Sequence, residues 1–290
     1  FLPMSGDPGA LPSGRPCVSK RGRTKAAQAP HKPVENQIDL ESLRLSSFES
    51  LENDASRGIC SQCGHSRKYY CHECVLLTPG VAAPDVALPF TVDIVRHPKE
   101  KSSKSSAIPL QLLSKGVKLH TFPDLPVFPH DETLLLFPSE SSSDARETDW
   151  TGITHVVVVD CTWFQTRPIL KHASLAGLRC VRIQDRGSRF WRYCHKAENI
   201  PGVVSTTEAI YFLLRDYFDA QHRQSYDGRY DDMLWFFVFF FKLISARSQE
   251  RSAKRARLMA ESAGPDVDLD QLTSKIRAGE LHPARDVLPG

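Results

Sequence analysis

Four cysteines stand close together in the chain with the spacing of a metal site, C-x2-C-x7-C-x2-C. They are Cys60, Cys63, Cys71 and Cys74. Two such pairs can place four thiolates around one zinc ion, and His65 and His72 lie nearby as substitutes. Gly64 suits the turn after the first pair, because glycine accepts a positive φ. The pattern predicts a closed, structural zinc site, and an accidental or redox-active pair of dithiols is the alternative.

A second candidate group follows an apolar run. Residues 156–159 are all valine, which is typical of a buried strand, and the next residues are Asp160, Cys161, Thr162 and Trp163. In open α/β sheets, ligands bind beyond the carboxyl ends of the strands. Asp160 is therefore a candidate for chemistry. The alternative is that Asp160 or Thr162 caps the helix that follows.

A third candidate group begins a helix. Ser205 and Glu208 have the spacing of a capping box, in which the Glu208 carboxylate returns to the backbone amide of Ser205. The helical pattern continues through Ile210, Leu213, Leu214 and Tyr217. A capped helix N-terminus also keeps its backbone amides directed at an anion. Glu208 is thus a cap or a candidate acid-base group, and the two roles can coexist.

Basic residues gather in two internal segments. His97, Lys99, Lys101 and Lys104 fall within eight residues, and a solvated loop is the alternative to a phosphate contact there. Within 186–196, aromatic side chains alternate with Arg186, Arg189, Arg192 and Lys196, a mixture that suits phosphates and stacked bases. A half-buried connection over the core is the alternative there. The basic runs at 20–25 and 247–257 suit RNA contact or nuclear import.

The elements that would position these residues alternate between strand and helix. Apolar runs predict strands at 90–95, 134–137 and 156–159. Helical patterns cover 107–113, 164–175 and 208–218, and a further helix begins near 231 and runs through 241. Such alternation predicts an α/β fold with a mostly parallel sheet and flanking helices.

Composition sets the domain limits and excludes some classes of protein. The chain has 290 residues, 41% of them hydrophobic, and a net charge of +3, which is too small to argue for nucleic acid by itself. The longest apolar run, 233–241, is far shorter than the ~20 residues of a membrane span. We expect a disordered tail over 1–57, a zinc knuckle over 58–80, an α/β catalytic domain over 81–246 and a basic, largely disordered tail over 247–290. The clustered cysteines favour an intracellular protein.

Several of these segments together resemble one family. Asp160, Thr162 and Trp163 match the D-x-T-W motif of the DTW-domain tRNA-uridine aminocarboxypropyltransferases. Other segments of the chain resemble elements of that family and follow in the same order. They are the cysteine knuckle, the His97-Pro98-x-Glu100 element, the strand and loop at 134–140, and Ser205-Thr206-x-Glu208-Ala209. Tyr226-Asp227-Gly228 and the Phe-rich helix after it resemble the eukaryotic branch that modifies the tRNA D-loop. The chain departs from the family at Cys161, where Ser or Gly is usual, and at Cys71 and Cys74, which many relatives space as C-x-C.

The resemblance implies an activity and a set of roles. The activity is transfer of the 3-amino-3-carboxypropyl group from S-adenosylmethionine to N3 of a uridine in tRNA, forming acp3U, on a fold similar to the knotted SPOUT methyltransferases. Asp160 would be the base or a positioning group, and Glu208 an alternative base. The donor would lie against Thr162, Trp163, Phe137, Ser139, Ser205 and Thr206. The tRNA would contact Lys99, Lys104, Arg189, Arg192 and Lys196.

Two other functions stay open from the residues. One is a tRNA methyltransferase that uses the same donor, and the other is a non-catalytic zinc-knuckle protein that binds RNA. We expect tRNA as partner, no membrane association and a nuclear location. The sequence leaves open which tRNA and uridine are modified, whether the backbone is knotted and whether the chain forms oligomers.

Overall fold

The computed structural model describes residues 37–53, 56–184, 186–190, 204–263 and 268–277 of the 290-residue chain. The chain divides into two units, 1–33 and 34–290, and every described residue belongs to the second. Of the predicted RNA contacts, Arg192 and Lys196 lie outside the described residues.

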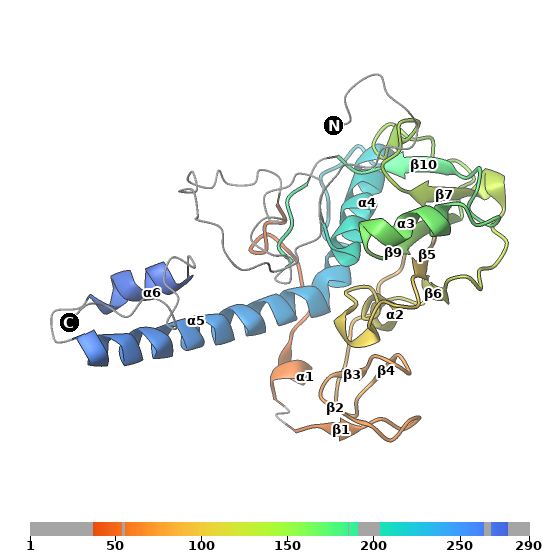
Figure 1. Ribbon diagram of the computed structural model, residues 1–290. Coiled ribbons are helices and arrows are strands. Elements are labelled where there is room, and N and C mark those ends of the chain that lie inside the picture. The colour runs from red at the N-terminus through yellow and green to blue at the C-terminus, as the bar shows by residue number, and fades with distance from the viewer. Residues whose placement is uncertain (1–36, 54–55, 185, 191–203, 264–267, 278–290) are drawn as a thin grey trace. The chain divides into compact units, whose positions relative to one another are not determined.

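A parallel sheet of six strands forms the centre of the described chain (Figure 1). The strands are β5 (Thr91–Arg96), β6 (Val117–Thr121), β7 (Thr133–Leu136), β8 (Ser143–Asp144), β9 (His155–Asp160) and β10 (Arg179–Arg182). Their order across the sheet is β6-β5-β9-β7-β10-β8, and each neighbouring pair is parallel. The predicted α/β fold with a mostly parallel sheet is therefore confirmed.

Helices cover both faces of this sheet. They are α1 (Glu49–Glu52), α2 (Leu110–Leu113), α3 (Trp163–Leu170), α4 (Thr206–Gln221), α5 (Trp235–Ala263) and α6 (Leu269–Arg277), with 3-10 turns η1 (Ser102–Lys104), η2 (His130–Glu132) and η3 (Asp231–Leu234). Two predicted helices are shorter than expected. Only 110–113 is α-helical within 107–113, and α3 ends at Leu170, after which hydrogen-bonded turns carry Leu175 into the same apolar cluster as Ile169. Among the described helices, none is long and apolar enough to cross a bilayer.

Alternate strand residues face two separate apolar layers. Val156 and Val158 of β9 pack in the cluster that includes Ile210 of α4 and Phe236 of α5. Val157, between them, packs instead in the cluster that contains Ile169 of α3. The sheet is therefore buried on both faces, which explains why its central strand is a continuous run of valine rather than an alternating one. The loops at the carboxyl ends of the strands remain to carry a site.

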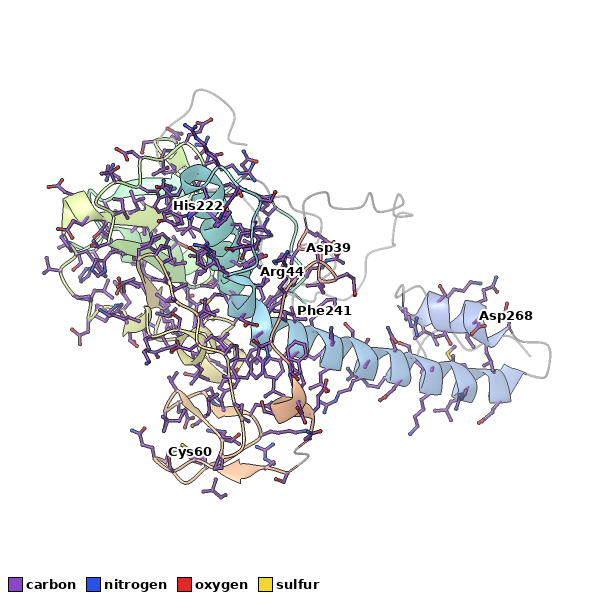
Figure 2. The ribbon with its side chains drawn as sticks, turned by 180° about the vertical axis from the view of Figure 1, so that it is seen from behind. Asp39, Arg44, Cys60, His222, Phe241 and Asp268 are labelled. Atoms are coloured by element: carbon purple, nitrogen blue, oxygen red, sulfur yellow. The ribbon has the colours of Figure 1, made fainter. Side chains whose placement is uncertain are left out.

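Residues 37–48 form an N-terminal strap over the start of α5. Ile38 is buried in a cluster with residues of α4 and α5. The backbone amide of Arg44 donates to Asp231 Oδ2 at 2.8 Å, and the Ser46 hydroxyl donates to Asp232 Oδ2 at 2.6 Å. The structure thus differs from the predicted disordered tail over 37–53, because the strap buries apolar side chains and its backbone amides donate to the two carboxylates. Asp39 and Arg44 of the strap are labelled in Figure 2. The predicted tail at 1–36 lies outside the described residues.

The carboxyl-terminal segment also departs from the expected disordered tail over 247–290. Helix α5 continues to Ala263, and α6 packs on it through Leu272 and Ile276, which bury Ala256. Leu272 and Ile276 are four residues apart and so lie on one face of α6, which gives the short helix an apolar side. Residues 264–267 and 278–290 lie outside the described residues.

Two short antiparallel hairpins carry the cysteines. The first pairs β1 (Gly58–Ile59) with β2 (Ser66–Arg67), and the second pairs β3 (Tyr70–Cys71) with β4 (Leu76–Leu77). Gly64 has a φ of +71°, as the expected knuckle turn requires. The aromatic rings of Tyr69 and Tyr70 pack edge-on against Phe239 and Phe236 of α5, and this contact holds the hairpins to the α/β domain. The SPOUT-like knot stays a prediction, because the connection after β10 includes 191–203, outside the described residues.

Candidate functional site

Asp160 joins three separate parts of the chain. It is the last residue of β9, and its side chain is 13% exposed. Its Oδ1 accepts a hydrogen bond from Thr206 Oγ1 at 2.7 Å, and its Oδ2 accepts one from Ser105 Oγ at 3.0 Å. The carboxylate is therefore held in one orientation by the first turn of α4 and by the loop after η1. Each carboxylate oxygen keeps a further lone pair for another partner.

The loop that follows β5 lies beside Asp160, because β5 and β9 are neighbours with Arg96 opposite Asp160. The Arg96 Nε atom is 3.8 Å from Asp160 Oδ2, and its Nη2 donates to the carbonyl of Glu100 at 2.9 Å. This guanidinium fixes the loop that carries Lys99 and Lys104. Both lysines are exposed at the same edge of the sheet as Asp160. The prediction that they contact tRNA stays untested.

Thr162, and not Asp160, caps the helix after β9. Thr162 is the N-cap of α3, and its backbone amide donates to the Gln165 side chain at 2.9 Å. This settles one choice that the sequence left open, because the Asp160 carboxylate bonds to α4 and to the 105 loop instead. Thr162 itself is exposed beside Asp160. Trp163 begins α3.

Glu208 has the geometry of a structural residue. Its side chain is fully buried, and it accepts hydrogen bonds from the Ser205 amide at 2.8 Å, from Ser188 Oγ at 2.7 Å and from the Arg189 amide at 2.6 Å. The capping box with Ser205 is present. Burial raises the pKa of Glu208, against the lowering effect of these hydrogen bonds. Because three donors fill a carboxylate that solvent does not reach, the structure disfavours Glu208 as the alternative base.

The structure brings some of the other residues that are predicted to bind the donor close to Asp160, but not all of them. Thr206 lies against Asp160, whereas the hydroxyl of Ser205 is buried and accepts from the Glu208 amide at 3.3 Å. Phe137 and Ser139 follow β7, which neighbours β9, so they stand at the same edge of the sheet as Asp160. The Ser139 carbonyl accepts from the Ser142 amide at 3.1 Å and shapes a turn there.

Arg189 is exposed but already engaged. Its Nε donates to the carbonyl of Ile38 in the strap at 3.3 Å, and its amide donates to Glu208. The segment at 186–190 is thus fixed between the strap and the N-terminus of α4. Arg186 is also engaged, since its Nη2 donates to the buried Asp216 at 2.9 Å. The described part of the basic segment, 186–190, is therefore held in place by hydrogen bonds from the side chains of Arg186 and Arg189.

The four predicted zinc ligands come together in a compact group. The Sγ atoms of Cys60, Cys63, Cys71 and Cys74 all lie within 4.8 Å of one another, and those of Cys63 and Cys71 are 3.6 Å apart. Four thiolates at the usual zinc distance would be separated by about 3.8 Å. None of the four is in a disulfide. The cysteines therefore fit a tetrahedral metal, and they lie in the hairpins rather than at the edge of the sheet that holds Asp160.

The surroundings of Cys71 favour the thiolate form. Burial opposes ionisation of this thiol, but the amides of Cys74 and Glu73 and the Arg67 guanidinium outweigh it, and together they lower the pKa of Cys71 to about 6. Backbone amides directed at sulfur are what the knuckle turn provides. His65 Nδ1 lies 3.3 Å from Cys63 Sγ, which keeps this histidine adjacent to the group.

Two residues of the Asp160 site have no clear sequence signal. Ser105 stands in a run of serines without a motif, and Arg96 is the last residue of a strand. Ser105 and Asp160 are separated by 55 positions in the chain. Only the pairing of β5 with β9 brings the loop after β5 against the end of β9.

Comparisons with known proteins identify the family of the chain. The tRNA-uridine aminocarboxypropyltransferase 1 of Mus musculus is 30% identical over 272 residues, covering 76% of this chain and 89% of the relative. The protein of the same name from Homo sapiens is 29% identical, covering 78% of this chain and 90% of the relative. A solved structure, the SAM-dependent rRNA:acp-transferase Tsr3 from Vulcanisaeta distributa, matches 68% of this chain and 98% of its own at 17% identity, with a TM-score of 0.33. The family model described as DTW domain matches residues 59–245. The chain, with Asp160, Thr162 and Trp163 at the end of its central strand, belongs to the DTW domain family.

Proposed function

We propose that this protein transfers the 3-amino-3-carboxypropyl group of S-adenosylmethionine to N3 of a uridine in the D-loop of tRNA. The relatives named above are called tRNA-uridine aminocarboxypropyltransferases. This chain matches each of them over most of that relative's length. The observation that carries the proposal here is the Asp160 carboxylate, held at the end of β9 by hydrogen bonds from Ser105 and Thr206.

The reaction asks for little covalent chemistry from the protein. The carbon–sulfur bond of the donor breaks, a bond from the same carbon to N3 forms, and methylthioadenosine leaves. The N3 proton needs an acceptor, and the chain needs to hold N3 in line with the carbon. Asp160 is the proposed acceptor, since its oxygens keep unused lone pairs and its side chain is partly open to solvent. Thr162, at the same strand end, is exposed to solvent and is a proposed contact of the donor.

Nucleoside mass spectrometry tests the proposal. Purified protein would be incubated with tRNA and labelled S-adenosylmethionine, and the digested tRNA would be searched for the mass of acp3U. A methyl adduct in place of acp3U would identify a methyltransferase. Absence of any adduct, together with no binding of donor in a calorimetric titration, would leave a zinc-knuckle protein that only binds RNA.

We also propose that Cys60, Cys63, Cys71 and Cys74 hold one zinc ion with a structural role. The separation of the four sulfurs and the burial of Cys60 and Cys71 support this, since all four ligands come from the protein and leave no open position for substrate. The metal would fix the two hairpins relative to each other. The hairpins in turn contact α5 through Tyr69 and Tyr70.

We further propose a SPOUT-like knot, which the resemblance to the family implies. We also propose a nuclear location. Arg247, Arg251, Lys254, Arg255 and Arg257 are all exposed on α5, where an import receptor could reach them. A fluorescent fusion of the intact chain would be compared with one in which Lys254 and Arg255 are alanine. Retention of the variant in the nucleus would assign import to another segment.

A further inference from the structure

A cavity of about 200 Å³ is lined by residues of the loop after β5 and of α5, and one of them, Ser105, bonds to Asp160. One wall carries hydroxyls from the loop after β5, at Ser103, Ser105 and Ser106. Aromatic side chains also line the cavity, namely Tyr70 of the cysteine hairpins and Phe236 and Phe240 of α5. Ser103 is exposed, so the cavity has an edge at the surface.

The cavity is linked to Asp160 through one hydroxyl residue, Ser105. Ser105, which lines it, donates to Asp160 Oδ2 at 3.0 Å. Thr207, which also lines it, follows Thr206, the donor to Asp160 Oδ1. The carboxylate is thus one hydrogen bond behind the cavity wall. A group bound in the cavity that donates to Ser105 Oγ would be joined to the proposed proton acceptor through that hydroxyl.

The polar groups on the wall are available to a ligand. Within the described part of the chain, the hydroxyls of Ser103 and Ser106 make no hydrogen bond to protein, and each can donate or accept. The Ser106 carbonyl, in contrast, accepts from Thr207 Oγ1 and is engaged. A planar ligand with carbonyl oxygens at its edge would satisfy the free hydroxyls while its faces meet the aromatic wall.

Size and chemistry decide between the two reactants. Pockets for drug-sized molecules are roughly 300–1,000 Å³, so this cavity is too small for the whole donor and suits a single ring. RNA-binding proteins recognise unpaired bases by stacking them on aromatic side chains and by hydrogen bonds to their edges. In uracil, the two carbonyls flank N3, and hydroxyls that hold either carbonyl turn N3 towards the same wall. That wall is the one backed by Asp160.

We propose that this cavity receives the uracil ring of the acceptor nucleotide, turned out of the tRNA. The assignment rests on the proposed function for its acceptor, and it names the surface that takes the base. Tyr70 gives the cysteine hairpins a direct part in the site, because it forms a side of the cavity as well as packing on Phe236 at a centroid distance of 5.1 Å.

Photo-crosslinking tests the assignment without requiring turnover. tRNA transcribed with 4-thiouridine in place of uridine would be bound to the full chain, irradiated and digested, and the crosslinked peptides would be mapped. We expect crosslinks to the 103–106 loop, to Tyr70 or to Phe240. Crosslinks confined to other segments would overturn the assignment. Loss of the cavity crosslinks on adding saturating methylthioadenosine would assign the cavity to the donor instead.

Two substitutions at neighbouring positions of α5 compare a residue that lines the cavity with one that does not. Phe240→Ala removes part of the aromatic wall, whereas Phe241→Ala changes the next residue, which does not line the cavity; Phe241 is labelled in Figure 2. Both phenylalanines are half-buried, but Phe240 also packs against the rings of Tyr69, Phe236 and Phe239, so a melting curve for each variant separates lost packing from lost base binding. We expect Phe240→Ala to weaken the cavity crosslinks and to raise KM for tRNA about tenfold, with donor affinity unchanged, and Phe241→Ala to do neither.

Equal effects of the two variants would refute the cavity as the uracil site. The transfer assay on the wild-type chain tests the proposed function independently of the base site. Crosslinks in the cavity without acp3U would contradict the proposed function while supporting the base site. Formation of acp3U with crosslinks elsewhere would support the function and overturn the base site.

Discussion

Thr206 Oγ1 donates a 2.7 Å hydrogen bond to Oδ1 of Asp160, across 46 positions of sequence. Thr206 is the first residue of α4, and Asp160 is the last residue of β9. The bond therefore fastens the N-terminus of one helix to the carboxyl end of the central strand. The second carboxylate oxygen accepts a hydrogen bond from Ser105, which lines the cavity. Asp160 is therefore the first residue to test by substitution.

Asp160→Asn should abolish transfer and leave a folded protein that binds tRNA. The amide has nearly the shape of the carboxylate and can still bond to the two hydroxyls, but it cannot take the N3 proton. We expect the single-turnover rate to fall by roughly two or more orders of magnitude, the usual scale for loss of a general base. Asp85→Asn is the control, since Asp85 is exposed and, among the described residues, forms an ion pair only with the exposed Lys115. Near-normal transfer by Asp160→Asn, at an unchanged melting temperature, would refute the role.

Glu208→Gln should lower stability rather than the chemical step. A glutamine amide would present N–H groups to one of the three donors that now bond to the carboxylate, which costs about 1–3 kcal/mol for an unsatisfied buried group. Urea unfolding would measure the loss, and transfer per folded molecule should stay close to wild type. A variant that melts normally but transfers at a hundredth of the rate would restore Glu208 as a base.

The pH dependence of unfolding gives a second measure for Glu208. Burial raises its pKa in the folded state above the unfolded value, so the folded protein binds the proton more tightly. The contribution of this group to the free energy of unfolding is then largest at low pH and falls as the pH rises through the raised pKa. Glu208→Gln should remove that slope. A parallel pH profile for wild type and variant would show that the three hydrogen bonds cancel the effect of burial.

Replacing Cys60 and Cys63 with Ser should remove metal and solubility together. Purified wild type should carry about one zinc per chain by elemental analysis, because the four sulfurs are spaced for one tetrahedral ion. Cys180→Ser serves as control, since this thiol lies on β10 and outside the group. Stoichiometric zinc in the double variant would place the ligands elsewhere.

Lys99→Ala combined with Lys104→Ala should weaken tRNA binding and flatten its salt dependence. Each lost phosphate contact lowers the slope of log K against log salt by about 0.9, so the pair should lower it by up to about two. The matched control is Lys115→Ala with Lys118→Ala. These lysines are also exposed, but they stand at the start of β6, the opposite edge of the parallel sheet. If both double variants keep the wild-type slope, the tRNA lies on another face.

Gly228→Ala should destabilise the chain through the strap. Gly228 has a φ of +86°, and a Cβ there would come within 2.8 Å of the Arg44 side chain. Gly152→Ala separates strain from collision, because Gly152 has a similar φ of +73° with open space around it. We expect Gly228→Ala to lower the melting temperature more than Gly152→Ala. Equal losses would mean that Arg44 moves aside at no cost and that the strap tolerates a side chain at 228.

The sequence by itself determined those features whose signal is local. The cysteine spacing, the run of valines before Asp160 and the capping box at Ser205 each lie within a short segment, and each is present in the fold. Helix and strand preferences act between residues a few positions apart, so the class of fold could be predicted from them.

The tertiary structure alone decided what these features contact. Thr162 took the cap of α3 and left Asp160 to Ser105 and Thr206, which are 55 and 46 positions away. Glu208 became a buried acceptor because the 188–189 segment returns to α4, and 37–48 became ordered because Asp231 and Asp232 accept its backbone. Such contacts depend on strand order and on which loops share an edge of the sheet. Spacing along the chain does not encode them, since the free energy that selects them comes from burial and pairing across the whole domain.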